Sequence, residues 1–276
     1  MMSLASRLIP PECRPAGDVP EIVLAQRPGI QAFARWHTRI KFRVMERLFR
    51  KHLGPGARFL DMACGTGDAL AIAWLCQPQC ELWGLDIDRE SLAVARRRVP
   101  AAILREGDML NPDLPKAHFD AVHEFGATFM VPNWEALAKV YLSLLRDGGI
   151  LLWELPQKWS AAHISYFLSL APKITAADTG IKRVLRSFLP SKYTFHSEGE
   201  IAKVLKSTGY GYEVLERVPI WYFYCPRYLS RVLNILWKIL GDRLYDRLDK
   251  INGIVWPRYS GYYLVIRKLG SGENPC

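Results

Sequence analysis

The 276-residue sequence lacks any apolar run of the ~18–20 residues that a membrane-spanning helix needs, because Arg or Lys interrupts every candidate. Its first residues are too short and too proline-broken a stretch for a signal peptide. It also lacks internal repeats and low-complexity tracts, while half of its residues are apolar. This composition supports a sizeable core and argues against disorder, a collagen-like repeat or a coiled-coil rod. We therefore expect a folded cytoplasmic protein.

Cysteine is sparse and follows no ligand pattern. The sequence has six cysteines, no CxxC pair, and no histidine near Cys76 and Cys80. A structural zinc site needs four closely grouped ligands, and disulfides are rare inside cells. We predict reduced thiols and no metal site.

The net charge of +10 is unevenly distributed along the chain. Residues 51–156 carry more acidic than basic side chains, whereas the segments before and after them are basic. An acidic centre favours a cationic or neutral ligand, and the basic flanks face either an anionic partner or solvent.

Short apolar runs alternate with helix-length segments through the first half of the chain. A helical period extends from about 29 to 52 and ends at Gly54-Pro55-Gly56. The predicted strands are 58–62, 82–85, 102–104, 121–123 and 150–154, with a glycine turn at 148–149, and the predicted helices are 68–76, 91–98 and 134–145. Strands separated by helices indicate parallel βαβ units. We predict an α/β fold with a doubly wound, mostly parallel, Rossmann-like sheet that binds ligands beyond the carboxyl ends of its strands.

The regular pattern ends after Pro156. Residues 157–195 are aromatic and basic, and a capping-box pattern at Ser197 then starts a helix over 201–207. Strands are predicted at 213–220 and 262–267. We expect an N-terminal arm (1–28) and a single domain (29–276) with a cofactor-binding core (53–156), a lid insertion (157–195) and an amphipathic helical insertion (224–259).

A glycine-bearing loop follows the first predicted strand. Gly65 and Gly67 allow a ligand to approach the backbone closely at the start of a helix. The dinucleotide fingerprint GxGxxG requires a third glycine where Leu70 stands, which disfavours a nicotinamide cofactor. Asp61, at the end of the strand, repels a pyrophosphate and attracts an ammonium group.

Two more acidic residues follow the next two strands. Asp86 ends the second strand, where a carboxylate can accept hydrogen bonds from two vicinal ribose hydroxyls. Asp108 follows the third and can accept a hydrogen bond from an exocyclic amine such as that of adenine, with Ile87 and Met109 as apolar neighbours of the ring. Three acids at successive strand ends form one row, which predicts recognition of a cationic nucleoside.

At these positions the chain resembles the class I S-adenosylmethionine-dependent methyltransferases, in their small-molecule group. The resemblance covers roughly residues 30–156 and continues more weakly at 193–209 and in the last strands. The residues that carry it are Leu60-Asp61-Met62-Ala63-Cys64-Gly65-Thr66-Gly67, Gly84-Leu85-Asp86-Ile87-Asp88, Glu106-Gly107-Asp108-Met109, Phe119-Asp120-Ala121-Val122 and Leu145-Arg146-Asp147-Gly148-Gly149-Ile150.

The resemblance implies a seven-stranded sheet whose last strand is antiparallel, with S-adenosyl-L-methionine as the cofactor. The implied cofactor-binding residues are Asp61, Ala63, Gly65, Gly67, Asp86, Ile87, Asp108, Met109 and Glu124, with Glu124 lining the methionine end. Ala63 departs from the family, because it replaces the first glycine of the usual loop.

A general base is needed only when the methyl acceptor is a phenol, an alcohol or an acidic carbon. The candidates are His163 in the lid insertion and Glu124 after the fourth strand, together with His123 and His196. Strand alternation buries His123, which favours a core histidine over a base. A histidine on a lid can be a general base or an ordinary surface residue, so both interpretations apply to His163.

The acceptor site must come from the insertions. Residues 221–224 are aromatic, and a predicted helix over 226–240 has a broad apolar face beside a narrow cationic one. Such a helix either docks on its own domain or lies on an anionic membrane surface, at the inner face of a membrane. Both interpretations predict a small lipophilic or aromatic acceptor.

Two other functions remain open. A nucleic-acid methyltransferase would use the basic flanks, but Glu154-Leu155-Pro156-Gln157 does not match the Asn/Asp-Pro-Pro-aromatic pattern of base-methylating members. A regulatory module that binds the cofactor without catalysis is compatible with the lack of a clear base. The sequence predicts no oligomeric state.

Overall fold

The structure is a computed structural model that describes residues 32–131, 133–156, 196–220, 235, 239 and 261–270. The predicted arm (1–28), the lid insertion (157–195) and all of the insertion 224–259 except positions 235 and 239 lie outside the described residues. Within those residues, no helix is both long enough and apolar enough to cross a membrane.

Seven strands form one sheet in the order β3-β2-β1-β4-β5-β7-β6. The first five strands pair in parallel, and β7 runs antiparallel to both β5 and β6. The predicted Rossmann-like, doubly wound sheet with an antiparallel last strand is confirmed. The strands are β1 (Arg58–Met62), β2 (Glu81–Asp86), β3 (Ile103–Glu106), β4 (Phe119–Glu124), β5 (Leu145–Pro156), β6 (Tyr212–Ile220) and β7 (Gly261–Lys268).

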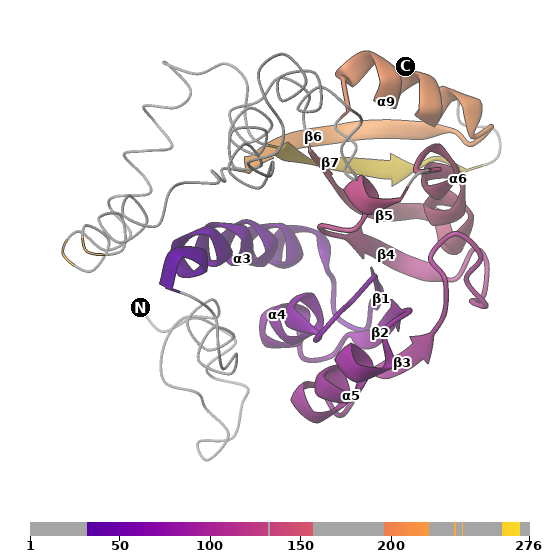
Figure 1. Cartoon of the computed structure of the whole chain (residues 1–276). Helices are drawn as coiled ribbons and strands as arrows, with labels where there is room; N and C mark the ends of the chain where they lie inside the picture. Colours follow the sequence, from indigo (N-terminus) through magenta and orange to yellow (C-terminus); the bar gives the residue numbers. More distant parts are fainter. Residues whose placement is uncertain are drawn as a thin grey trace, which may run out of the picture.

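Helices cover both faces of this sheet (Figure 1). On one face lie α3 (Ala32–His52), α4 (Asp68–Cys76) and α5 (Arg89–Arg98), and on the other α6 (Glu135–Leu144) and α9 (Glu198–Ser207). The predicted capping box of α9 is present, because Ser197 Oγ accepts a hydrogen bond from the Glu200 N–H while the Glu200 carboxylate accepts one from the Ser197 N–H.

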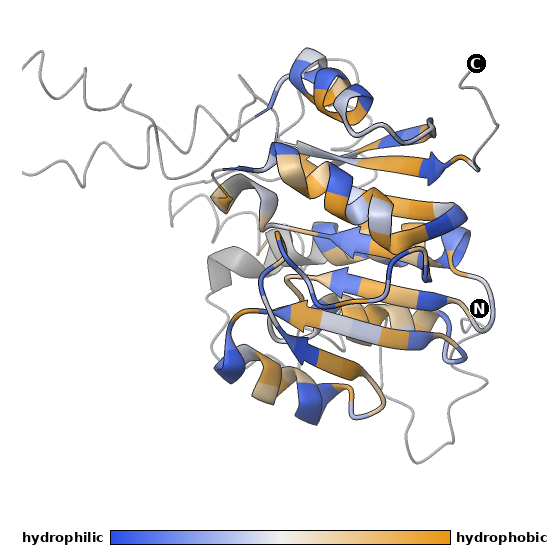
Figure 2. Cartoon of the chain, turned by 90° about the vertical axis from the view of Figure 1, so that its right-hand side faces the viewer, coloured by the Kyte–Doolittle hydropathy of each residue, from blue (hydrophilic) through white to orange (hydrophobic). Residues whose placement is uncertain are grey.

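Each face has its own apolar core. Phe49 and Phe59 are fully buried on the α3 face, and Tyr141 and Trp153 on the α6 face. The strand bodies are mainly hydrophobic in Figure 2. This pattern is expected for strands that are buried on both faces. Burial of their apolar side chains stabilises the packing of the helices on the sheet.

Most strands extend beyond their predicted bounds, and β5 and β3 show the physical reasons. The predicted turn at Gly148–Gly149 lies within β5, at an irregularity where the pairing with β4 shifts register between Phe119 and Ala121. β3 extends to Glu106, because Arg105 and Glu106 pair with the end of β2. As an edge strand with exposed polar residues, β3 has no hydrophobic pattern that would show its full length.

Candidate functional site

The loop after β1 is built from three residues with left-handed backbone conformation. Ala63, Gly65 and Gly67 have φ values of 55°, 51° and 79°. Glycine adopts this region freely, whereas Ala63 adopts it at a cost of about 1–2 kcal/mol. A Cβ added to Gly65 would meet no atom within 4 Å, so space is open above the loop for a ligand.

Packing against neighbouring elements fixes the position of the loop. A Cβ on Gly67 would lie 3.1 Å from the Cβ of Ala95 in α5, so this glycine allows close helix–loop packing. Arg98 Nη1 donates to the Thr66 carbonyl at 3.1 Å and also pairs with the Asp68 carboxylate. In β2, a Cβ on Gly84 would come within 2.9 Å of Cys64 Sγ and of a Leu70 methyl. Contacts with α5, α4 and β2 therefore fix the position of the loop.

Asp86, at the end of β2, contacts the loop directly. Its Oδ2 accepts a hydrogen bond from the Gly65 N–H at 2.7 Å, and its Oδ1 accepts one from the Asp88 N–H at 2.9 Å. Each carboxylate oxygen can accept a second hydrogen bond, so two further donors can be bound here. Ile87 follows with 74% of its surface exposed, as an apolar residue that a ligand ring can cover.

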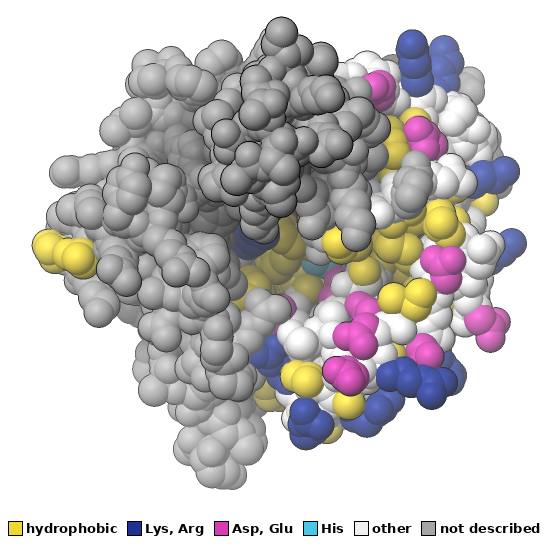
Figure 3. Space-filling model, in the orientation of Figure 1, with side chains coloured by type: hydrophobic (Ala, Val, Ile, Leu, Met, Phe, Trp, Pro, Cys, Tyr) yellow, Lys and Arg dark blue, Asp and Glu magenta, His cyan; other side chains and the backbone are white. Residues whose placement is uncertain are grey.

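The end of β3 brings Asp108 and Met109 beside the end of β2. The Gly107 N–H donates to the Asp86 carbonyl at 3.0 Å. The Asp108 carboxylate is exposed and accepts from the Leu110 N–H at 2.9 Å, which orders the turn, and Met109 is half-buried. Figure 3 shows acidic side chains gathered beside a hollow on this part of the surface.

Asp61 lies below this row and is buried. Its Oδ1 is 2.6 Å from His123 Nδ1 in the adjacent strand β4. Burial raises the pKa of Asp61, and the His123 contact opposes that rise. His123 is fully buried, as predicted for a core histidine, but its ring nitrogens contact Asp61 and the Tyr263 hydroxyl.

Glu124, the last residue of β4, is fully buried on the opposite face. It accepts hydrogen bonds from the N–H groups of Ala127 and Thr128 and from the Thr128 hydroxyl. Burial and the nearby Glu154 carboxylate raise the pKa of Glu124 to about 8, so the group is mostly protonated at neutral pH. These contacts order the turn that leads into η2 (Thr128–Met130).

The structure thus gathers most of the predicted cofactor residues at one edge of the sheet. Loop residues 63–67 meet Asp86 directly, and the ends of β2 and β3 are hydrogen-bonded to each other. Glu124 lies at the same edge on the α6 face, and its predicted roles stay predictions. The catalytic candidate His163 lies outside the described residues. His196 is buried and packs against Trp134 with ring centroids 3.8 Å apart and the ring planes tilted by 37°.

Three residues of this edge were not singled out from the sequence. Tyr263, Thr128 and Glu154 are buried and hydrogen-bonded around the ends of β4 and β5. Only the strand register brings them there, for example the pairing of Glu154 with Tyr263. A buried polar residue in an otherwise apolar strand, such as Glu154, was the available signal.

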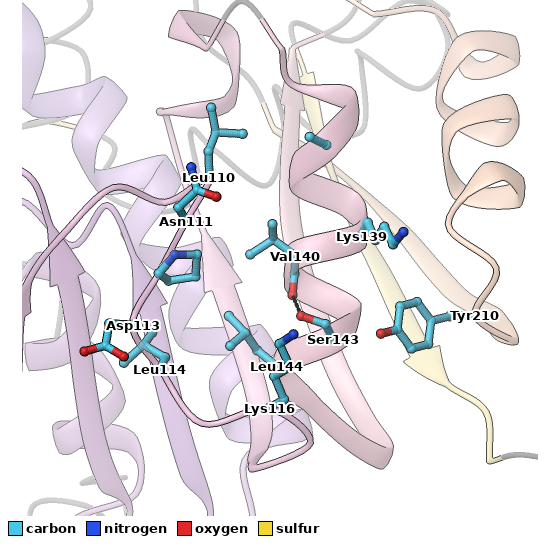
Figure 4. A pocket seen from close by; sticks show the side chains of 12 residues that line it. Leu110, Asn111, Asp113, Leu114, Lys116, Lys139, Val140, Ser143, Leu144 and Tyr210 are labelled. Atoms are coloured by element: carbon cyan, nitrogen blue, oxygen red, sulfur yellow. Dashed lines mark hydrogen bonds between the residues drawn. The ribbon is translucent and has the colours of Figure 1, made fainter.

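A separate groove of about 630 Å³ lies between the β3–β4 connection and α6 (Figure 4). It contains none of the predicted site residues. Leu110, Leu114 and Val140 line it together with Lys116, Lys139 and Tyr210. The connection over residues 107–118 forms no helix, which leaves this part of the sheet face open.

Comparisons with known proteins agree with this geometry. A family model described as a methyltransferase domain matches residues 59–149. Demethylmenaquinone methyltransferase from Deinococcus radiodurans is 31% identical over 162 residues, which are 55% of this chain and 67% of that protein. The dTDP-3-amino-3,6-dideoxy-alpha-D-glucopyranose N,N-dimethyltransferase from Streptomyces fradiae is 30% identical over 146 residues, which are 51% of this chain and 54% of that protein.

Solved structures share the fold. The [4+2]-cyclase SpnF matches with a TM-score of 0.55 at 16% identity, over 83% of this chain and 82% of that one. An S-adenosylmethionine-dependent methyltransferase from Mesorhizobium loti matches with a TM-score of 0.50 at 17% identity, over 80% and 96%. At such identities the likeness concerns the fold alone. Together with the sequence relatives, the loop and its row of acids show that the chain belongs to the class I S-adenosylmethionine-dependent methyltransferases.

Proposed function

We propose that this enzyme transfers the methyl group of S-adenosylmethionine to a small lipophilic or aromatic acceptor, in an O-, C- or N-methylation. The observation that carries the donor site is the contact between Asp86 Oδ2 and the Gly65 N–H, which puts an acceptor of ribose hydroxyls against an open glycine loop. The donor, when bound, supplies an electrophilic methyl group on a sulfonium.

The residues present fit this donor. Gly65 leaves space for a ligand above the loop, and the lone pairs that remain on Asp86 can accept from two ribose hydroxyls. Exposed Ile87 and half-buried Met109 can flank an adenine ring, and Asp108 can accept from its amine. Asp61 is the carboxylate we assign to the ammonium group of the amino-acid arm.

Methyl transfer is an in-line displacement, so the protein must align acceptor and donor and exclude water. A base is required only for an acidic acceptor, and we predict His163 or Glu124 for that role. Relatives that methylate demethylmenaquinone support a quinone-like or aromatic acceptor.

Contact with an anionic membrane surface is a further part of the proposal. Ile235 and Ile239 are helical positions one turn apart, and 57% and 72% of their surfaces are exposed. Apolar side chains exposed on one side of a helix favour an interfacial location near a lipophilic acceptor. Co-sedimentation with anionic vesicles, compared with neutral ones, tests this part; protein that stays in the supernatant contradicts it.

The central experiment uses methyl-labelled donor with three acceptor sources: a lipid extract, an RNA fraction, and buffer alone. We expect label in the solvent-extractable lipid fraction. Label in RNA would favour the nucleic-acid alternative, and donor binding without transfer to any fraction would favour a regulatory module.

The variant Asp86→Ala tests the donor site itself. It should weaken donor binding by about 1–3 kcal/mol in calorimetric titration, because ribose hydroxyls lose their acceptor.

A further inference from the structure

A chain of hydrogen bonds below the glycine loop joins side chains from three strands, β1, β4 and β7. Asp61 Oδ1 lies 2.6 Å from His123 Nδ1, and His123 Nε2 lies 2.9 Å from the Tyr263 hydroxyl. Asp61 and His123 are directly opposite each other in the β1–β4 pairing. All three side chains are buried, with 3%, 0% and 0% of their surfaces exposed.

The contacts fit one arrangement of protons. When Asp61 is ionised it only accepts, so His123 then carries a proton on Nδ1 and donates it to Asp61. The Nε2 atom is then an acceptor, and the Tyr263 hydroxyl donates to it. This arrangement satisfies every member while the imidazole is neutral, and it fixes both the tautomer and the plane of the ring.

Aromatic packing holds the imidazole in place and keeps water out. The Phe49 ring of α3 lies edge-on to His123 at a centroid distance of 5.1 Å, and the Phe59 ring of β1 stacks at 6.0 Å. His123 therefore cannot turn away from Asp61 without disturbing the core of the α3 face. Its contact occupies Oδ1 of Asp61, and Oδ2 remains for a cation.

The charged groups around this chain are mainly carboxylates. Asp68 and Asp86 act on Asp61 from α4 and β2. Glu154 and Glu124 act on Tyr263 from β5 and β4. From α3, Lys41 lies over the Phe125 ring at 4.4 Å, and Phe125 packs on Tyr263. Among the described residues, His123 is the one titratable base whose side chain directly contacts Asp61.

We propose that His123 is a positioning residue for the donor site: it orients the Asp61 carboxylate toward the ammonium group of the donor's amino-acid arm, and the proton shared by this pair controls affinity for that arm. The inference rests on the proposed function. Protonation of the Asp61 carboxylate removes its negative charge, so affinity for the ammonium group falls as pH decreases. Because the His123 contact lowers the pKa of Asp61, removing the imidazole moves this fall to higher pH.

The experiment compares two ligands in calorimetric titrations between pH 6 and 9. S-adenosylhomocysteine carries the amino-acid arm, and 5′-methylthioadenosine lacks it. The variant is His123→Asn, and the matched control is His118→Asn, which changes a histidine just before the other end of β4, where it contacts Arg58. Tyr263→Phe is the second variant, since it keeps the imidazole and removes only the hydroxyl that fixes its tautomer.

We expect the affinity of the wild-type protein for S-adenosylhomocysteine to fall as pH decreases, and its affinity for 5′-methylthioadenosine to change little. His123→Asn should weaken binding of S-adenosylhomocysteine roughly tenfold at pH 7 and move the fall in affinity to higher pH. It should leave 5′-methylthioadenosine within about twofold, as His118→Asn should for both ligands. Tyr263→Phe should shift the profile in the same direction by a smaller amount.

An equal loss for both ligands in His123→Asn would show a merely structural role and overturn the inference. So would an unchanged pH profile in both His123→Asn and Tyr263→Phe. Nitrogen NMR of the wild-type imidazole gives a readout that needs no variant: a proton on Nδ1 supports the inference, and a proton on Nε2 alone overturns it. If neither ligand bound to the wild-type protein, the proposed donor site itself would fail.

Discussion

Two buried polar networks lie at the same edge of the sheet on opposite faces, and they handle a buried carboxylate differently. On the α3 face, Asp61 pairs with an imidazole from the neighbouring strand. On the α6 face, Glu124 is bonded to the turn that follows its own strand, and burial raises its pKa to about 8. In the first network burial also raises the pKa of the carboxyl group, but the imidazole contact opposes that rise. The second keeps a neutral acid that shapes the backbone.

The largest expected effect concerns the pH dependence of stability. Glu124 has a raised pKa of about 8 in the folded state, against its ordinary value of 4.5. The folded protein therefore holds a proton that the unfolded chain releases between these values, so this group makes the free energy of unfolding decrease as pH rises through that window. Its contribution to the slope approaches about 1.4 kcal/mol per pH unit.

Glu124→Gln should remove this contribution. A glutamine can present its carbonyl oxygen to the two backbone N–H groups, and its amide N–H can donate to Thr128 Oγ1 in place of the bond that the Thr128 hydroxyl donates to Glu124. Urea unfolding at pH 5.5, 6.5 and 7.5 should give a flatter dependence for the variant than for the wild type. Parallel curves for the two proteins would mean that Glu124 is ionised in the folded state.

The next effect concerns donor affinity. Asp61→Ala removes the carboxylate assigned to the ammonium group and should weaken S-adenosylhomocysteine by about 1.5–3 kcal/mol, or roughly 10- to 150-fold. The loss should exceed that of Glu124→Gln, because only the α3-face network borders the glycine loop. Fluorescence or calorimetric titration of both variants decides the order, and a larger loss in Glu124→Gln would reverse the roles of the two faces.

The third effect concerns the α6-face network alone. Thr128→Val keeps the shape of the side chain but removes the hydroxyl that bonds Glu124 and accepts from Trp153 Nε1 at 2.8 Å. The Glu124 carboxyl group and Trp153 Nε1 each lose a hydrogen-bond partner, so the free energy of unfolding should fall by about 1–3 kcal/mol. Denaturant titration measures it. Affinity for 5′-methylthioadenosine should be unchanged, and a loss there would connect this face to the donor site.

The smallest effect provides the reference for an ordinary local contact. Ser197→Ala removes one half of the capping box of α9, which lies outside both networks. The expected loss in the free energy of unfolding is about 1 kcal/mol, with no change in its pH slope. A loss as large as that of Thr128→Val would show that the buried network adds nothing beyond a surface cap.

The sequence was sufficient for features that depend on local pattern. The alternation of apolar runs and helices predicted the sheet, and the acids at strand ends predicted a row of carboxylates; the contact of Asp86 with the Gly65 N–H came only from the structure. The same alternation predicted that His123 is buried, but it could not predict its partners. Asp61 and Tyr263 are 62 and 140 positions away from His123, and only the strand order brings them together.

Other differences have local causes. Two adjacent glycines are typical of turns, so the sequence predicts a turn at 148–149, whereas the structure places both residues within β5, with a φ of 75° at Gly148. The protonated state of Glu124 depends on complete burial near Glu154, which composition does not reveal.

Gly84 sets a limit on how this protein can be redesigned. Atoms of the glycine loop, α4 and β3 all approach the hydrogen that this residue carries in place of a side chain. Even a methyl group at this position would push against Cys64 and displace the loop. To accommodate enlarged nucleoside analogues, smaller side chains should therefore be introduced at Ile87 or Met109, and Gly84 should be left unchanged.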